Sequence, residues 1–502
     1  MKTIFNLLIF IFIFFLQTVC TFSSEKKSID SHSLTLRQAI GIGLQNNYDF
    51  MNAELDLDRA RSERREQEDE YSMRLNTSMI SAFNRSENES SDFSTEDYEH
   101  NINLELERKF MVTGGSVSLF STLNYNDFDD SSTLFDSQKD YDHSYGIRFH
   151  QPLLKGAGFH VNRIPVQRSR ISQKNARYDV ELSRRSLIAR IIRLYYGAVK
   201  ADRLIDITKL AVKEARTHVQ QTQVKLEEGL VAQIDVSQAE LQLSRQENSI
   251  VNARQNYENA MDSLSAELGI DFSENIKLEA KIIYEPEMLD MDELIAEALK
   301  HRLEISKTQN RLIQYDLNIL TSSNNRLPSL NLSLETAIDS DGQRLQDSFD
   351  DDDREYRVEM GLSYTFGDRT WREKYLRNLI SKHRLKNEFS ALKDDIKLEV
   401  KQSVRRYNSL KKSIEILENA VDLAEYTLSL SNQSYTAGLI RNTDLLKAQD
   451  DLLRTQTEYL STLMDFEIAI ADVLLTIGRP IEPDNLRIHI DSTLKHSGET
   501  DK

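Results

Sequence analysis

The stretch GLVAQIDV begins at Gly229, and the stretch GLIRNTDL begins at Gly438, 209 residues later. Each stretch separates two long segments with helical periodicity and carries an Asp six residues after its Gly. A Gly just after a helix and a carboxylate in the first turn of the next helix are common end and start signals. The chain therefore contains the same helical turn twice, which indicates an internal repeat.

A second pair of similar segments marks the start of each repeat. TLRQAIGIGLQNNYDF begins at Thr35, and DMDELIAEALKHRLEI begins at Asp290, 255 residues later. Thr35 is followed three positions later by Gln38, and Asp290 by Glu293, which is the pattern of a helix N-cap and its capping partner. Because the two offsets differ, the first repeat is 46 residues longer between its start and its Gly-to-Asp turn.

Heptad patterns flank both turns. In the first repeat, apolar residues recur at spacings of four and three from Leu187 to Val219, and nine of the ten positions are also apolar 209 residues later. Heptads of this kind favour helices that pack against each other. We predict helices at 35–70 and 290–322 and helical hairpins at 168–268 and 372–477. The repeats would cover 24–289 and 290–480, and 481–502 would be a C-terminal tail.

Between the helical parts, segments of about ten residues alternate apolar and polar side chains, as strands with one apolar face do. One example is Tyr356, Val358 and Met360, which alternate with Arg357 and Glu359. The predicted strands are 71–84, 101–110, 115–125, 143–151, 328–338 and 355–366. This pattern suits a transmembrane barrel, and an antiparallel sheet that covers a water-soluble core would show it as well.

The connections between these strands favour the barrel. Val112–Gly115 is a tight turn, whereas Asn84–His100, Asn126–Asp142 and Asp339–Glu355 are predicted to be long, polar, acidic loops. Short turns on one side and long loops on the other are typical of outer-membrane barrels. Six strands are too few to close a barrel, and an open sheet edge cannot face lipid. We therefore expect several copies of the chain to share one barrel in a symmetric oligomer.

Composition and targeting narrow the class of protein. The net charge of −18 argues against a nucleic-acid partner. Residues 1–23 have the pattern of a secretory signal peptide, with Lys2 before an apolar run over Ile4–Leu16. Cys20, the only cysteine, lies in this segment, and a lipid anchor at Cys20 is the alternative to simple cleavage.

No catalytic constellation is recognisable. The ten histidines are scattered without an HExxH motif, and there is no Walker motif. We therefore predict that the chain is not an enzyme and has no cofactor, no metal site and no energy source of its own. The acidic loops could bind Ca²⁺, although solvated loops are the simpler interpretation.

Taken together, these features resemble the TolC family of outer-membrane efflux and secretion channels. The resemblance is carried by LTLRQAIGIGLQNN, GLVAQIDVSQAELQL, YTAGLIRNTDLLKAQDDL and QPLLKGAG, and it spans nearly the whole chain after residue 23. It implies a mixed α/β membrane protein, a homotrimer with a transmembrane antiparallel β-barrel continuous with a long antiparallel α-helical coiled-coil tunnel. The barrel would lie in outer-membrane lipid of a Gram-negative bacterium, and the tunnel in the periplasm.

The resemblance also implies a function and partners. The trimer would be a passive exit duct for an inner-membrane pump or ABC exporter, joined to it through a periplasmic adaptor (membrane fusion) protein. Service in type I protein secretion or in metal efflux is a closely related possibility. A secreted or surface coiled-coil protein with a structural or adhesin-like role is the alternative from another class. The family usually contributes four strands per chain, so six would give a wider barrel of about 18 strands or leave the extra pair as an appendage.

The hairpin tips are where the resemblance places a gate. Three copies of Asp444 around a threefold axis would form a ring of negative charge that selects and binds cations. Tyr435 matches the family's gate tyrosine, and Asp235 matches its partner on another hairpin. The alternatives are a helix-dipole role for Asp235 and ordinary helix packing for Tyr435.

Two positions depart from the family's gate. Lys447 stands where the family has a second ring carboxylate, and Arg441 lies beside Ile440, where the family has an arginine. A mixed Asp–Lys constriction would weaken block by divalent cations and favour a salt bridge within the chain. The tip turns, where an adaptor would make contact, comprise Gly229, Leu230, Val231, Gly438, Leu439 and Ile440.

Overall fold

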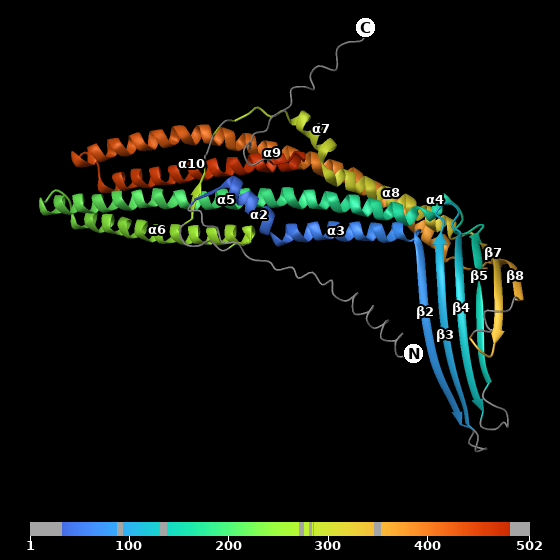
Figure 1. Ribbon diagram of the computed structural model, residues 1–502. Helices are drawn as coiled ribbons and strands as arrows, with labels where there is room; N and C mark the ends of the chain where they lie inside the picture. The colour runs from blue at the N-terminus through green and yellow to red at the C-terminus, as the bar shows by residue number, and fades with distance from the viewer. Residues whose placement is uncertain are drawn as a thin grey trace, which may run out of the picture.

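The computed structural model describes residues 33–87, 94–130, 138–270, 276–280, 284, 286–345 and 353–481. The predicted signal peptide, Cys20 and nearly all of the predicted tail lie outside these residues. In Figure 1 the long helices run side by side in an elongated bundle, and one curved sheet extends from its end.

The helices occur in the two predicted sets. The first half has α2 (Leu36–Asn46), α3 (Tyr48–Asp69), the short α4 (Phe159–Asn162), α5 (Ile164–Glu227) and α6 (Gln233–Leu268). The second half has α7 (Met291–His301), α8 (Leu303–Asn324), α9 (Thr370–Thr436) and α10 (Asn442–Ile477). At 1.5 Å per residue, the 67 residues of α9 extend for about 100 Å. None of the helices among the described residues is both long and apolar enough to span a membrane.

The helices predicted at 35–70 and 290–322 are each interrupted once, which the sequence pattern did not show. The breaks lie at Asn47 and Arg302, at matching positions of the repeat. The side-chain oxygen of Asn47 accepts from the Phe50 amide at 3.1 Å and so caps α3, and its side-chain amide donates to the Glu267 carbonyl at 3.0 Å. Local capping and a contact with α6 therefore outweigh continuation of the helix.

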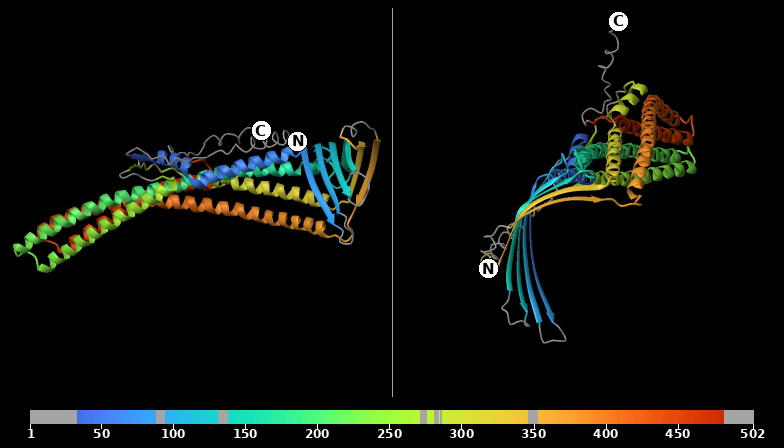
Figure 2. Two further views of the ribbon diagram at one scale, coloured as in Figure 1. Left: turned by 60° about the horizontal axis from the view of Figure 1, so that its bottom comes forward. Right: turned by 90° about the vertical axis from the view of Figure 1, so that its right-hand side faces the viewer.

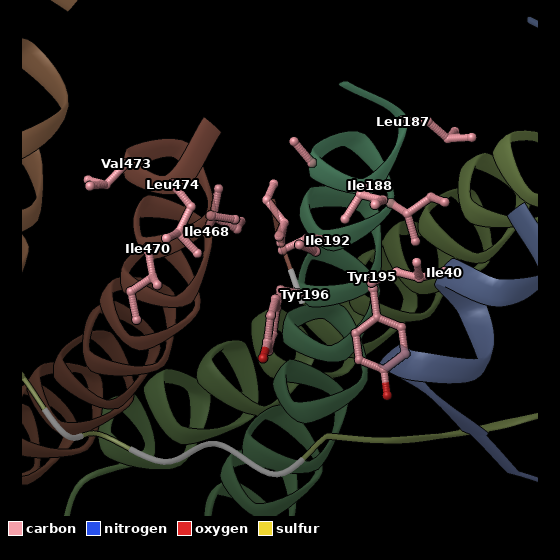
Figure 3. Close-up of a cluster of buried hydrophobic side chains, with 14 of the residues drawn as sticks. Ile40, Leu187, Ile188, Ile192, Tyr195, Tyr196, Ile468, Ile470, Val473 and Leu474 are labelled. Carbon is pink, nitrogen blue, oxygen red and sulfur yellow. The ribbon is translucent and has the colours of Figure 1, made fainter. Parts of the chain in front are cut away.

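The core lies midway along the bundle, where the two halves meet. A two-stranded parallel sheet, β1 (Ser33–Thr35) with β6 (Lys277–Glu279), packs there. The Tyr195 hydroxyl lies 3.0 Å from the Leu34 carbonyl oxygen and 2.8 Å from that of Glu279, so α5 is joined to both strands. Figure 3 shows Ile192 and Tyr196 on the side of α5 that faces the apolar side chains of α10.

The predicted heptad seam coincides with this core. Its first-half positions Leu187 and Ile191 and their second-half counterparts Ile396 and Val400 are all almost completely buried. The repeated spacing therefore predicted the interior face of both long helices correctly.

Gly269 ends α6 at a position that requires glycine. Its φ of +67° is left-handed, and a Cβ there would lie 2.7 Å from the carbonyl oxygen of Asn46. Gly229 has a similar φ of +73°, but a Cβ there would meet nothing within 4 Å. An alanine at either position would pay about 1 kcal/mol for the left-handed backbone, and only at Gly269 would its Cβ also clash with backbone. We therefore expect the unfolding temperature of Gly269→Ala to lie well below that of Gly229→Ala. Equal midpoints in thermal melts of the two variants would contradict this.

One antiparallel sheet contains all six predicted strands. They are β2 (Met73–Glu87), β3 (Ser94–Lys109), β4 (Ser116–Asp130), β5 (Gln138–Pro152), β7 (Ser329–Gly342) and β8 (Asp353–Ser363), in the order β2-β3-β4-β5-β7-β8. The β5–β7 pair joins the two halves of the chain. Among the described strands, β2 and β8 each have one neighbour, so both sheet edges are open. Figure 2 shows that the sheet curves like part of a cylinder wall.

Strands extend into all three segments predicted to be long loops, so the predicted loops were too long. Asn84 pairs with Asp97, Asn126 pairs with Asp140, and Asp339 pairs with Asp353. Backbone ladder bonds do not require an apolar side chain, whereas the alternating pattern is visible only where one face is apolar. The strands therefore continue beyond the point at which their sequence signal ends.

The two faces of the sheet differ in polarity, as the alternation predicted. The register aligns Leu75, Leu106, Leu119 and Ile147 across four strands on one face. Many side chains on this face are exposed in the single chain, among them Leu75 at 66%. The opposite face carries hydrogen-bonding and charged groups, including an ion pair of 2.7 Å between Arg148 and Glu335.

Candidate gate at the hairpin tips

The two tip turns have the same backbone geometry. Gly229 and Gly438 have φ of +73° and +74°. In each turn the next residue donates its amide to a carbonyl five residues earlier: Leu230 to Lys225 and Leu439 to Ser434, both at 2.8 Å. These bonds satisfy carbonyls that the helix end leaves free. The prediction that both glycines terminate the incoming helices is confirmed.

The tip turns expose apolar side chains. Leu230 is 68% exposed and Leu439 is 78% exposed. Val231 and Ile440 are half-buried, and Ile440 packs against a small apolar cluster at the second tip. Each tip turn therefore presents one large apolar side chain outward, and the second tip rests on a packed apolar cluster.

Asp235 and Asp444 begin the returning helices α6 and α10. The Asp235 carboxylate accepts from the Ala232 amide at 3.1 Å, and that of Asp444 accepts from the Arg441 amide at 3.2 Å. Each Asp therefore satisfies a backbone donor at a positive helix end. Asp235 is half-buried, whereas Asp444 is exposed.

Tyr435 is buried at the end of α9, with 3% of its surface exposed. Its hydroxyl lies 3.1 Å from the Thr222 hydroxyl. The Lys225 ammonium lies 3.9 Å from the centre of the Tyr435 ring and donates to the Tyr435 carbonyl at 2.5 Å. Within one chain, Tyr435 therefore contacts Thr222 and Lys225 of α5 and also the ring of His218 on the same helix. Its expected link with Asp235 of another hairpin stays a prediction.

Thr222 and Lys225 were not identified from the sequence. The available signal for Thr222 was weak, since it continues the four-and-three spacing of the seam as a polar residue. Lys225 lies in the last turn of α5, where a cation favours the negative helix end.

The remaining predicted site residues lie near the start of α10 and point away from the buried cluster. Arg441, Asp444 and Lys447 are all exposed. Their charges are therefore accessible to solvent in the single chain. In the part of the chain that the structure describes, no group of three or more His, Cys, Asp or Glu side chains could hold a metal ion.

Comparisons with known proteins agree on one architecture. A model of a protein family described as outer membrane efflux protein matches residues 116–270 and 294–478. No curated protein matches the chain.

Several solved structures share the fold. The CmeC outer membrane channel of Campylobacter jejuni is 14% identical, with a TM-score of 0.68 over 92% of this chain and 90% of that one. The open-state MtrE outer membrane channel of Neisseria gonorrhoeae is also 14% identical, with a TM-score of 0.66 over 92% and 96%. The outer membrane protein VceC of Vibrio cholerae is 16% identical, with a TM-score of 0.65 over 89% and 97%.

Proposed function

The chain belongs to the outer membrane efflux protein family, and from this membership we propose how its strands and hairpin tips work. Members are the outer-membrane channels of tripartite efflux systems, so the chain is a channel and not an enzyme. It is located in the outer membrane of a Gram-negative bacterium and extends a large helical tunnel into the periplasm. A periplasmic adaptor and an inner-membrane pump are its partners. This membership favours the duct over an adhesin-like scaffold.

We propose that three copies close one barrel of 18 strands. The open edges β2 and β8 carry backbone groups that lipid cannot satisfy, and pairing β8 of one copy with β2 of the next would satisfy them. The register supports a wide barrel, because β3 and β4 pair continuously with β2 and β5. The additional pair is thus part of the proposed barrel wall and not an appendage.

The exposed apolar face of the sheet supports an outward orientation toward lipid. Aromatic rings gather on this face above the aliphatic rows: Phe83 and Tyr98 lie 4.7 Å apart, and Tyr125 and Tyr141 also lie 4.7 Å apart. Aromatic belts mark the edges of the apolar band in outer-membrane barrels. The Arg148 and Glu335 side chains, on the opposite face, would then line the lumen.

At the other end of the tunnel, we propose that the six hairpin tips of the trimer form the gate. Exposed Asp444 would contribute one carboxylate per copy to a ring, while its bond with the Arg441 amide fixes the orientation of that carboxylate. Leu230 and Leu439 would offer the adaptor exposed apolar contacts.

We expect Asp444→Ala to raise the single-channel conductance of the trimer in millimolar divalent cation, because the ring would lose its charge. The measurement is a planar-bilayer recording with and without the cation. Asp451→Ala is a suitable control, since Asp451 lies further along α10 and pairs with Arg454. An identical cation response in Asp444→Ala and the parent protein would exclude Asp444 from the constriction.

The transported cargo follows from the pump. Drug efflux, type I protein secretion and metal efflux are compatible with the same duct. A deletion strain tested for drug sensitivity, metal sensitivity and protein secretion separates them, and an unchanged strain in all three assays would count against the duct itself.

A further inference from the structure

One histidine is buried against Tyr435, beside other residues of the proposed gate. His218 of α5 has 3% of its surface exposed, and its Nε2 lies 2.6 Å from Oδ1 of Asn442, the first residue of α10. The His218 and Tyr435 rings meet edge to face, with centroids 5.2 Å apart. His218, which belongs to the first hairpin, therefore contacts both helices of the second hairpin.

The orientation of Asn442 determines the protonation of His218. The Asn442 amide group donates to the Asp235 carbonyl at 3.0 Å and to Oε1 of Gln238 at 3.4 Å. Its oxygen is therefore the atom that faces His218, and Nε2 of the imidazole must donate. His218 Nδ1 is buried and has no hydrogen-bond partner among the described residues. A neutral imidazole with its proton on Nε2 satisfies this arrangement.

These contacts bring all four long helices together at one point. His218 comes from α5, Tyr435 from α9 and Asn442 from α10, and the Asp235 carbonyl comes from α6. The matching position 209 residues after His218 is Thr427, so the second hairpin does not repeat the arrangement. Each chain therefore has a single histidine latch, the name used below for the contacts of His218 with Asn442 and Tyr435.

We propose that His218 is a positioning residue of the gate, whose neutral side chain holds the two hairpin tips of a chain together and whose protonation releases them. Mild acid would then open the duct. The proposal rests on the proposed function of the tips as a gate and adds a trigger to it.

The surroundings of His218 disfavour the imidazolium. A second proton would reside on Nδ1, where no acceptor is present among the described residues. The charged group facing the latch from α5 is the Lys225 ammonium, which is also positive. The group that α9 places beside His218 is the ring of Tyr435, and the group that α6 places beside Asn442 is the Asp235 carbonyl. On α10, the cationic Arg441 directly precedes Asn442. No carboxylate contacts the imidazole among the described residues.

The sign of the pH effect follows. Burial lowers the pKa of His218 from its ordinary value of 6.5, Lys225 lowers it further, and the bond with Asn442 opposes both. The released tip, with a hydrated His218, binds protons more readily than the packed tip. The latch is therefore fully stable above pH 6.5 and loses stability as the pH falls toward the lowered pKa. Each unit of pKa difference changes the ratio of packed to released tips by about tenfold.

The test is planar-bilayer conductance of the purified trimer between pH 7.5 and pH 5.5, values chosen as roughly one unit on either side of the ordinary histidine pKa. We expect the parent conductance to rise several-fold on acidification, and the rise to be absent in His218→Gln, whose amide can still donate to Asn442. His383→Gln is the matched control, because His383 is exposed on α9, and it should keep the parent profile. An unchanged acid response in His218→Gln overturns the proposal.

A second variant separates the latch from a general loosening of the tip. Asn442→Asp offers a carboxylate to the imidazolium of His218. We therefore expect acidification to lower the conductance of this variant or to leave it unchanged. Acid opening of parent strength in Asn442→Asp would also overturn the proposal. Trimers without conductance at any pH would overturn the duct itself, whereas pH-independent conducting trimers would overturn the latch alone.

Discussion

Deletion of residues 94–130, which removes β3 and β4, should narrow the barrel and lower the size of polymer that it admits. In a trimer, the remaining four strands per chain would close a barrel of 12 strands instead of the proposed 18. Because barrel diameter grows roughly linearly with strand number, the diameter should fall to about two-thirds and the cross-section to less than half. The antiparallel order is preserved, since removing two strands lets β2 run next to β5 in the original direction.

Exclusion of polyethylene glycols added from the barrel side measures this change, and an electron cryo-microscopy map of the trimer counts the strands directly. Deletion of β3 alone (Ser94–Lys109) is the topological control. It would force β4 to run parallel to β2, so we expect no assembled trimer. A deletion variant that admits the same polymers as the parent protein would show that β3 and β4 do not belong to the barrel wall.

The comparison of the two halves indicates that the additional strand pair leaves the long helices unaffected. The returning helices α6 and α10 both have 36 residues, and the incoming helices α5 and α9 have 64 and 67. The 46 additional residues of the first repeat are confined to the part before its hairpin. Strand pairs can be added to a sheet without altering helices packed elsewhere, because each pair satisfies its own backbone groups.

Sequence patterns predicted the elements that depend on local periodicity. The heptad spacing identified the buried faces of α5 and α9, and the glycines at the tips identified their ends. Both signals are read within a few helical turns, so distant contacts do not disturb them. The breaks at Asn47 and Arg302 were missed because they depend on partners far along the chain. Glu267 holds Asn47, and the Thr476 carbonyl accepts from Arg302 at 3.1 Å.

The histidine latch could not be predicted for a related reason. His218 lies one residue before the seam position Val219, so the heptad gives it no role inside its own hairpin. Its partner Asn442 belongs to the other hairpin, and the seam spacing does not specify which surfaces of two hairpins face each other. Polar contacts between hairpins therefore require the packed structure, whereas contacts within a hairpin follow from the sequence.

Phe466→Ala should destabilise the folded protein strongly, because Phe466 of α10 belongs to the core that joins both halves. It is 1% exposed, and its ring centroid lies 5.0 Å from that of Tyr407 and 5.3 Å from that of Tyr284. Tyr407 in turn accepts from the Glu287 amide at 2.9 Å. Truncation would leave a cavity between α9, α10 and the segment before α7, with an expected loss of about 3–5 kcal/mol.

Loss of helical circular dichroism on heating the purified protein measures this effect. Met288→Ala is the control, because Met288 follows Glu287 directly and is 89% exposed, so its truncation removes little packing. Similar midpoints for the two variants would contradict a structural role for the Phe466 cluster. A large difference has a functional consequence, since α9 and α10 extend from this core to the gate. Because the proposed histidine latch depends on how α9 and α10 are held at their base, a loosened core should also weaken the proposed pH response.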